Sequence, residues 1–293
     1  MDFGRLITAM ITPFYPDGRV NYEEAQKIAA YLLEHGSDGL CVAGTTGESA
    51  TLSPVERRTL FDAVLEVTRE KGASMLAGCG ANNTAESIRL SQSAQAAGAD
   101  GVLLVTPYYN KPTQEGLFAH YQAVAQSIDL PVVLYNVPGR TGVNLLPTTV
   151  SQLAAIPNIV AIKEATGDMD QMSLLAKSLP ADFRIYSGED SAVLPMLALG
   201  ASGVVSVCSH IVGPAMREML LAWEQGDTQK ALALHLRCFD AFRKMFLTTN
   251  PLPVKYAMHR LGFQTGPCRL PISWVTDEQA ASIDQLLRQL GLL

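Results

Sequence analysis

The feature that most constrains the fold is a repeated alternation of short apolar runs with helix-like segments along the 293 residues. The apolar runs are rich in β-branched residues, as is typical of strands that are buried on both faces. They lie at Leu6–Ile11, Gly39–Ala43, Met75–Cys79, Gly101–Val105, Val132–Asn136, Ile159–Lys163, Phe183–Ser187 and Gly203–Val207. Eight strands that alternate with helices predict an α/β protein with a closed (β/α)8 barrel, also called a TIM barrel.

A doubly wound parallel sheet is the alternative fold for this pattern. Such a sheet normally carries a glycine-rich phosphate-binding turn after its first strand. Here Thr12-Pro13-Phe14 follows the first predicted strand instead. The barrel is therefore the favoured fold.

Helix start and stop signals lie between the strands. Ser53-Pro54-Val55-Glu56 has the pattern of a capping box with proline at the first helical position, which predicts a helix to about Lys71. Asn83 begins a similar segment that Gly98 is expected to end. We expect the barrel to occupy residues 1–224 and a C-terminal helical extension, packed on the barrel, to occupy residues 225–293. Its helices are predicted at Asp227–Phe246, Pro253–Leu261 and Asp277–Leu290.

Composition excludes several classes of protein. The formal net charge is -6 and no cluster of Lys or Arg stands out, which argues against nucleic acid and membrane surfaces as partners. An uncharged stretch from Ser191 to Met216 is long enough to cross a bilayer. Proline and glycine residues interrupt it, so we interpret it as a buried helix followed by a strand. The five cysteines form no CxxC pair and the start lacks a signal-peptide pattern; both predict reduced thiols and a cytoplasmic location.

Lys163 is a single charge at the end of the apolar run that begins at Ile159. A buried lysine is rare because burial disfavours its charged form, and the neutral amine is a nucleophile suited to Schiff-base formation with a carbonyl. The alternative is that Lys163 reaches water at the strand end and pairs with Glu164. Aligning Val-Val-Leu-Tyr-Asn of the fifth strand with Val-Ala-Ile-Lys-Glu of the sixth gives Tyr135 and Lys163 the same parity, so both are expected to face one side. Glu164 is then expected to point away from Lys163, into the packing between strand and helix. Neighbouring strands are about 4.8 Å apart, which would allow the tyrosine hydroxyl to reach the amine.

Other polar residues follow the predicted strands, where barrel active sites lie. They form the segments Gly44–Ser49, Gly80–Asn82, Thr106–Asn110, Tyr135–Gly142 and Ser187–Asp190. Each has a structural alternative: a tight turn for Gly-Thr-Thr-Gly, surface aromatics for Tyr108-Tyr109 and a solvated loop charge for Arg140. Four acidic residues, Glu48, Glu164, Glu189 and Asp190, are expected to be hydrogen-bonded or solvated groups. The five histidines show no metal-ligand spacing, and a structural hydrogen bond is expected for His210.

These motifs resemble the N-acetylneuraminate lyase family of pyruvate-dependent class I aldolases over essentially the whole chain. The resemblance is carried by Gly44–Ser49, Thr106–Pro112, Tyr135–Gly142, Ile162–Gly167 and Asn250–Lys255. It is greatest to the branch that condenses pyruvate with L-aspartate 4-semialdehyde to give 4-hydroxy-tetrahydrodipicolinate, in lysine and diaminopimelate biosynthesis. An aldolase that cleaves N-acetylneuraminate or a 2-keto-3-deoxy sugar acid is the alternative, and Arg140 argues against it. A non-catalytic sensor of pyruvate-like acids is a third hypothesis, which the presence of Lys163, Tyr135 and Thr45 disfavours.

The resemblance also implies roles for single residues. Lys163 would form the imine with pyruvate and Tyr135 would transfer protons. Thr45 would link Tyr135 to Tyr109, and the family inserts this second tyrosine from the partner subunit. Residues that would bind the substrates are Thr46, Gly188 and Val205 around pyruvate and Arg140 at the carboxylate of the semialdehyde. No metal or organic cofactor is implied, and the expected assembly is a homotetramer built as a dimer of dimers.

The family's lysine-feedback site is also matched in part. The matching positions are Ser49, Ala50, Asn82, Glu86 and Tyr108. Two positions that carry histidine in feedback-inhibited relatives are Pro54 and Arg57 here. We therefore predict that inhibition by lysine is weak or absent.

Overall fold

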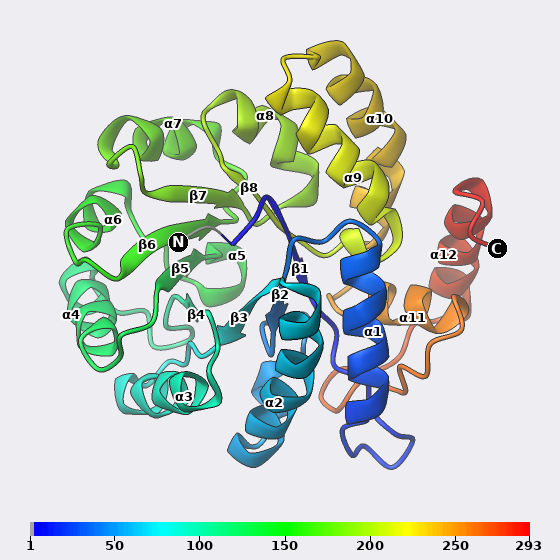
Figure 1. Cartoon of the computed structure of the whole chain (residues 1–293), viewed down its shortest axis with the longest axis horizontal. Coiled ribbons are helices and arrows are strands. Elements are labelled where there is room, and N and C mark those ends of the chain that lie inside the picture. Colours follow the sequence, from blue (N-terminus) through cyan, green and yellow to red (C-terminus); the bar gives the residue numbers. More distant parts are fainter. Residues whose placement is uncertain (1–2) are drawn as a thin grey trace.

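Eight parallel strands close into a barrel in the computed structural model, which describes residues 3–293 (Figure 1). Each strand pairs with its sequence neighbours, and β1 pairs with β8. The strands are β1 (Leu6–Ala9), β2 (Gly39–Val42), β3 (Ser74–Gly78), β4 (Gly101–Val105), β5 (Val132–Asn136), β6 (Ile159–Glu164), β7 (Arg184–Ser187) and β8 (Gly203–Ser206). The predicted TIM barrel is confirmed, the doubly wound alternative is wrong, and the strand ends differ from prediction by at most two residues.

Helices surround the barrel as an outer ring (Figure 1). They are α1 (Tyr22–Glu34), α2 (Pro54–Lys71), α3 (Thr84–Ala97), α4 (Gln114–Ala125), α6 (Pro147–Leu153), α7 (Met169–Ser178), α8 (Val193–Ala198) and α9 (Ser209–Glu224). Three short turns, η1 (Ser49–Thr51), α5 (Pro138–Thr141) and η2 (Asp190–Ala192), follow β2, β5 and β7. The predicted capping box is present, because the Ser53 hydroxyl accepts from the Glu56 amide and the Glu56 carboxylate accepts from the Ser53 amide. Gly98 ends α3 in the left-handed conformation, with φ of 85°.

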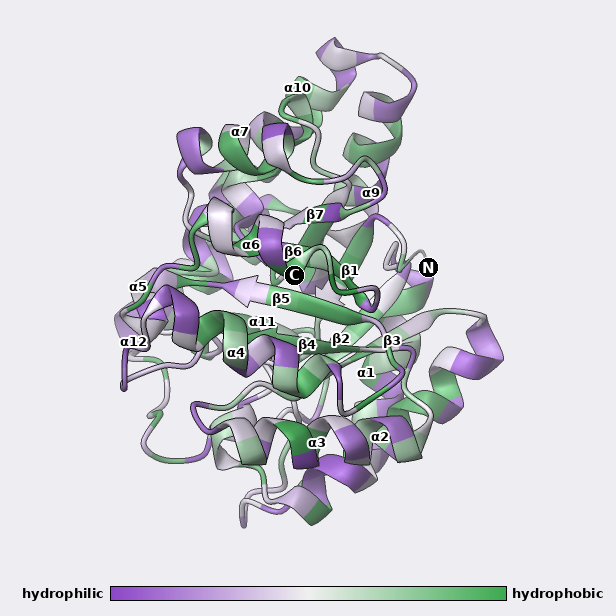
Figure 2. Cartoon of the chain, turned by 90° about the vertical axis from the view of Figure 1, so that its left-hand side faces the viewer, coloured by the Kyte–Doolittle hydropathy of each residue, from purple (hydrophilic) through white to green (hydrophobic). Residues whose placement is uncertain are grey.

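The core has two layers, one inside the barrel and one between strands and helices. Inside, large side chains such as Leu76, Val133 and Tyr186 fill the space, as in other small barrels. Outside, the helices place their apolar faces on the strands and their polar faces toward solvent (Figure 2). The interior is therefore packed, and Lys163 lies within this packed layer among apolar neighbours rather than in an open pore.

Three further helices follow α9. They are α10 (Thr228–Lys244), α11 (Leu252–Arg260) and α12 (Asp277–Gln289). In Figure 1, α11 and α12 lie at one side of the molecule, beyond α1. The uncharged stretch from Ser191 forms α8, β8 and the first part of α9, and no helix among residues 3–293 is long and apolar enough to span a membrane.

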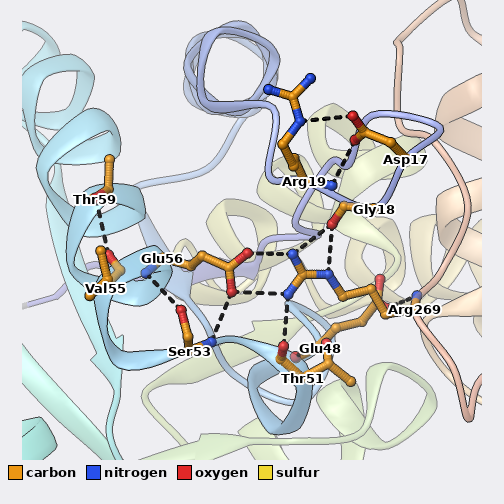
Figure 3. Close-up of polar contacts among 10 residues, drawn as sticks. All are labelled: Asp17, Gly18, Arg19, Glu48, Thr51, Ser53, Val55, Glu56, Thr59 and Arg269. Atoms are coloured by element: carbon orange, nitrogen blue, oxygen red, sulfur yellow. Dashed lines mark hydrogen bonds and ion pairs between the residues drawn. The ribbon is translucent and has the colours of Figure 1, made fainter.

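Arg269, in the segment between α11 and α12, holds this C-terminal region on the barrel (Figure 3). Its guanidinium donates to the carbonyl of Gly18 at 2.6 and 2.8 Å and to the carbonyl of Thr51 at 2.7 Å. It also forms an ion pair with Glu56 of the capping box. One side chain thus connects the C-terminal region to the loop before α1, to η1 and to the start of α2.

Candidate active site

Lys163 and Tyr135 lie side by side inside the barrel. They are register partners on β6 and β5, and each is 6% exposed. The Lys163 Nζ lies 4.3 Å from the centroid of the Tyr135 ring. The expectation that both side chains face one side is confirmed. The contact, however, is between the amine and the ring face; within residues 3–293 no hydrogen bond joins the tyrosine hydroxyl to the amine.

A register shift between β5 and β6 produces this pairing. Val132 pairs with Ile159, whereas the next residue, Val133, pairs with Ala161. An extra residue in one strand of a pair changes which side chains lie opposite each other beyond it. Without the shift Tyr135 would lie opposite Ile162, and the amine would lose its aromatic neighbour.

The surroundings of Lys163 contain no salt-bridge partner among residues 3–293. Glu164 faces the other side of β6 and accepts hydrogen bonds from Asn136, Gln171 and the amide of Thr166. The predicted orientation of Glu164, away from Lys163 and into the packing between strand and helix, is thus confirmed. The alternative of a Lys163–Glu164 pair is wrong.

Gly188 follows β7 and lies against the lysine stem. A Cβ at this position would come within 2.6 Å of the Ala165 Cβ and 3.1 Å of the Lys163 Cε. The first distance is shorter than real Cβ contacts, so a larger residue here would require Ala165 to shift, and the second would press on the lysine stem. Val205, on β8, is also buried in the interior layer. Both sequence-predicted pocket residues therefore lie in the same interior as the amine.

The acidic residue that follows Gly188 is part of the charged environment of the site. Burial and the neighbouring Asp190 raise the pKa of the Glu189 carboxyl, against the opposing pull of the Lys163 and Arg140 cations. Asp190 is buried and accepts from the amides of Val207 and Cys208. Asp190 is thus a scaffold group, as expected, whereas Glu189 is only half-buried.

The two threonines after β2 have different surroundings. Thr46 is buried, and its hydroxyl accepts a hydrogen bond from the Asn250 amide at 3.0 Å. Thr45 is half-buried and lines a cavity at the mouth. Within the described chain its hydroxyl forms no hydrogen bond to Tyr135 or Tyr109. Asn250 belongs to a motif noted in the sequence, but nothing in the sequence alone indicated its contact with Thr46.

Glu48 belongs to the same loop and has a structural partner. Its carboxylate accepts from the Lys255 Nζ at 2.6 Å and from the Arg269 amide at 2.8 Å. Both side chains of the Glu48–Lys255 pair are fully buried. Glu48 itself has φ of 53°, a conformation that is uncommon for a residue with a side chain. The pair therefore fixes the loop that carries Thr45 and Thr46.

The turn after β4 presents Tyr109 to solvent. Its side chain is 89% exposed and its φ is 75°. The turn is held on both sides, because the Tyr109 amide donates to the Thr141 carbonyl at 3.2 Å and the Asn110 side chain donates to the Asn82 carbonyl at 2.9 Å. An exposed aromatic ring on a fixed backbone is suited to an interface with another molecule.

A cavity of about 460 Å³ opens at the mouth of the barrel. Its walls include two predicted active-site residues, Thr45 and Arg140, and four of the five predicted lysine-site residues, Ser49, Ala50, Glu86 and Tyr108. The fifth, Asn82, is absent from the walls and binds the Tyr109 turn through its carbonyl. Lys163 and Tyr135 are not part of these walls. Four of the candidate regulatory residues thus share one cavity with Thr45 and Arg140.

Arg57, which departs from the pattern of feedback-inhibited relatives, lies in the wall of this cavity. It is buried and donates to the carbonyls of Gly78 at 2.6 Å and Ser49 at 2.8 Å. Burial lowers the pKa of its guanidinium, which nevertheless stays charged because arginine starts from so high a value. A fixed cation is therefore part of this wall.

His210 and the five cysteines are buried in the structure. The Nδ1 of His210 contacts the Val207 carbonyl at 2.8 Å, and its Nε2 accepts from the Ile11 amide at 3.2 Å. Burial lowers the pKa of His210 to about 4. The predicted structural role of this residue is confirmed. All five cysteines are free and buried, and no group of His, Cys, Asp or Glu among residues 3–293 could hold a metal ion.

Fold and site together define a TIM-barrel protein with a buried lysine amine beside a tyrosine at the carboxyl ends of its strands. The chain belongs to the dihydrodipicolinate synthetase family, whose model matches residues 2–290. It is 52% identical to the 4-hydroxy-tetrahydrodipicolinate synthase of Thermosynechococcus vestitus, with 100% of this chain and 99% of that protein covered.

Two solved structures extend the comparison. A DHDPS (dihydrodipicolinate synthase) from Cyanidioschyzon merolae with lysine bound has a TM-score of 0.98 at 44% identity, covering 99% of both chains. A chloride-inhibited dihydrodipicolinate synthase from Acinetobacter baumannii, complexed with pyruvate, has a TM-score of 0.96 at 39% identity, covering 100% of both chains.

Proposed function

We propose that this protein catalyses the condensation of pyruvate with L-aspartate 4-semialdehyde to give 4-hydroxy-tetrahydrodipicolinate, a lyase reaction of lysine and diaminopimelate biosynthesis. The observation that carries the proposal is Lys163, a buried amine with no salt-bridge partner in the described chain, beside Tyr135. The same activity is supported by the membership of the chain in the dihydrodipicolinate synthetase family and by its full-length relatives named 4-hydroxy-tetrahydrodipicolinate synthase.

Lys163 starts the reaction as a neutral amine. It attacks the keto carbon of pyruvate and loses water to form an imine, with Tyr135 giving and taking the protons. The imine withdraws electrons, so the methyl carbon loses a proton and becomes an enamine. The enamine attacks the aldehyde carbon, and the amine of the second substrate then displaces Lys163 as the ring closes. The imine supplies the electron sink, so this route uses no metal or organic cofactor.

The remaining residues of the site bind the two carboxylates and the pyruvate. We infer that the threonine pair, Thr45 and Thr46, receives the pyruvate carboxylate, with Gly188 and Val205 lining the pocket. Arg140 is assigned to the carboxylate of the semialdehyde, because its exposed guanidinium lies at the entrance and a planar fork suits a carboxylate. This arginine favours the synthase over an aldolase that cleaves sugar acids.

We further propose that the working assembly is a homotetramer, a dimer of dimers, in which Tyr109 of one protomer reaches the Thr45 of its partner. The exposed ring on its fixed turn supports this, as does the absence of a Thr45–Tyr109 bond within the described chain. Free buried cysteines support a cytoplasmic location. Residues 1–224 carry the catalytic groups, and residues 225–293 form an extension that fixes the mouth through Asn250 and Lys255.

Regulation by lysine is expected to be weak. Ser49, Glu86 and Tyr108 lie around the mouth cavity, but the Arg57 guanidinium holds a fixed positive charge in its wall. A cationic amino acid would be repelled there. Less than two-fold inhibition at 1 mM lysine is expected in a steady-state assay, and a clear sub-millimolar effect would overturn this expectation.

Borohydride reduction in the presence of pyruvate, followed by peptide mass mapping, tests the function. The expected adduct lies on the peptide that contains Lys163. An adduct on another lysine, or none, would refute the mechanism. Offering L-aspartate 4-semialdehyde and sugar-derived aldehydes to the same preparation then separates the synthase from the sugar-acid aldolases.

A further inference from the structure

Four polar side chains form a buried cluster on the outer face of β5 and β6, directly behind the Lys163–Tyr135 pair. We name this group, Asn136, Asn144, Glu164 and Gln171, the outer polar cluster. Asn136 and Glu164 are register partners, one residue beyond Tyr135 and Lys163 on the same two strands. Because side chains alternate along a strand, the two pairs point in opposite directions. The outer polar cluster thus touches both strands immediately behind the proposed reacting amine.

The contacts in the outer polar cluster join four segments. The Asn136 amide donates to Glu164 at 3.1 Å and to Asn144 at 2.8 Å. The Gln171 amide, from α7, donates to Glu164 at 3.0 Å and accepts from Asn144 at 2.7 Å. Asn136 also accepts from the Leu145 amide at 3.0 Å. These bonds connect the ends of β5 and β6 to α7 and to residues 144–145, which follow the α5 turn that bears Arg140.

Every group that contacts the Glu164 carboxylate is an N–H donor. The donors are Asn136, Gln171 and, at 2.8 Å, the backbone amide of Thr166. The side-chain amides cannot simply turn over, because Asn136 accepts from Leu145 and Gln171 accepts from Asn144 through their carbonyl oxygens. The position therefore requires a group that only accepts, which an ionised carboxylate provides and a glutamine does not.

Simple packing between strand and helix would not require this charge. Glu164 is 1% exposed and has no salt-bridge partner in the described part of the chain, and a buried charge without a cation costs free energy. An apolar side chain would avoid that cost but would leave the three N–H donors without an acceptor. The strong directional bonds of the carboxylate are instead suited to fixing the register at the end of β6, beyond the shift that brings Lys163 opposite Tyr135.

We propose that Glu164 is a positioning residue, which holds Lys163 in register with Tyr135 and, through Asn144, fixes the loop that follows Arg140. This rests on the proposed role of Lys163 as the imine-forming residue. Misplacing a reacting group by about 1 Å can cost a hundred-fold in rate. A loss of positioning should therefore appear in catalysis out of proportion to any loss of stability.

The test compares Glu164→Gln with Glu24→Gln in the full-length protein. Glu24, on α1 and away from the active site, is the control, because it is 3% exposed and accepts from the backbone amide of Gln264 at 2.8 Å. Unlike Glu164, it also pairs with a lysine, the largely exposed Lys27, at 3.2 Å. Thermal melting, kcat, KM for pyruvate and the rate of borohydride trapping are measured for both. For E164Q we expect kcat and the trapping rate to fall at least ten-fold, with KM for pyruvate changed less than three-fold. For E24Q we expect a comparable fall in melting temperature with kcat within two-fold of wild type.

Gln171→Leu provides a second, milder variant, which serves if E164Q does not fold. It removes one donor to Glu164 and one acceptor of Asn144, and we expect trapping to slow three- to five-fold. Equal kcat values for E164Q and E24Q, or trapping by Q171L at the wild-type rate, would overturn the positioning role. Failure of the wild-type protein to form an adduct at Lys163 would instead refute the proposed function, so the two failures are distinguishable.

Discussion

The protein has two buried lysines with opposite surroundings. Lys163 lies in the barrel interior, and Lys255 lies at the junction between the barrel and its C-terminal helices. Lys255 is 0% exposed; its amine is paired with Glu48 at 2.6 Å, bonded to the Pro267 carbonyl at 3.0 Å and 4.2 Å from the centre of the Phe14 ring. Lys163 is 6% exposed and has the Tyr135 ring as its neighbour, with no carboxylate pair in the described chain.

Burial alone therefore does not make a lysine reactive. Burial lowers the pKa of Lys255, while the charge of Glu48 opposes that change. Because the pair is hydrogen-bonded and has no access to solvent, its amine is occupied and serves structure. Lys163 lacks such an anion, so its amine is available to a carbonyl compound. The relevant difference is the partner and not the degree of exposure.

The largest expected effect is that of Lys163→Met, which tests the role of the lysine in the barrel interior. We expect activity to fall about ten-thousand-fold or more, since the nucleophile is lost. Stability should stay within about 1 kcal/mol of wild type or rise, because an unpaired buried amine is replaced by an apolar group of similar length. Assay of kcat/KM and urea unfolding check both parts. A stable, active K163M protein would remove the distinction between the two lysines.

Lys255→Met tests the lysine at the junction, where we expect stability rather than pyruvate trapping to be lost. It leaves the Glu48 carboxylate buried and unpaired, so we expect the free energy of unfolding to fall by about 3–5 kcal/mol. Trapping of pyruvate on Lys163 should persist in the folded fraction. Urea unfolding and borohydride trapping provide the measurements.

The double variant Lys255→Met with Glu48→Gln is the control for this change. Removing the stranded charge should recover at least half of the lost stability, since the penalty comes from the unpaired carboxylate and not from the missing amine. No recovery in the double variant would mean that the lost stability does not come from the unpaired Glu48 carboxylate.

The fold was predictable because its signals are local. Apolar runs, the capping box at Ser53 and the glycine at position 98 each act within a few residues, and an eight-fold repeat leaves few topologies. The parity of Tyr135 and Lys163 was also local, because it follows from alternation along two strands. The same argument placed Glu164 on the opposite face.

What the sequence could not provide depends on contacts between distant segments. Asn250 meets Thr46 and Lys255 meets Glu48 across more than two hundred residues. No spacing rule links such positions. The outer polar cluster was missed for a related reason, since amides such as Asn144 and Gln171 are ordinary on a surface and become informative only when the loop after α5 and the helix α7 come together.

The Glu56–Arg269 pair, in the same junction as Lys255 but partly exposed, gives the smallest expected effect. The Arg269 guanidinium lowers the pKa of Glu56 to about 2, from an ordinary value of 4.5. A carboxyl whose pKa is lower in the folded than in the unfolded state stabilises the fold at pH values above its unfolded-state pKa. This contribution is lost as the pH falls through its folded-state pKa. Because the pair is partly solvated, we expect the free energy of unfolding to fall by only about 1 kcal/mol between pH 5 and pH 2.

Arg269→Gln should remove this loss, whereas Arg58→Gln, in an exposed helical pair with Asp62, should leave it unchanged. Urea unfolding at stepped pH measures it, and an R269Q protein with the wild-type acid dependence would show that burial at the junction, rather than this ion pair, determines the effect.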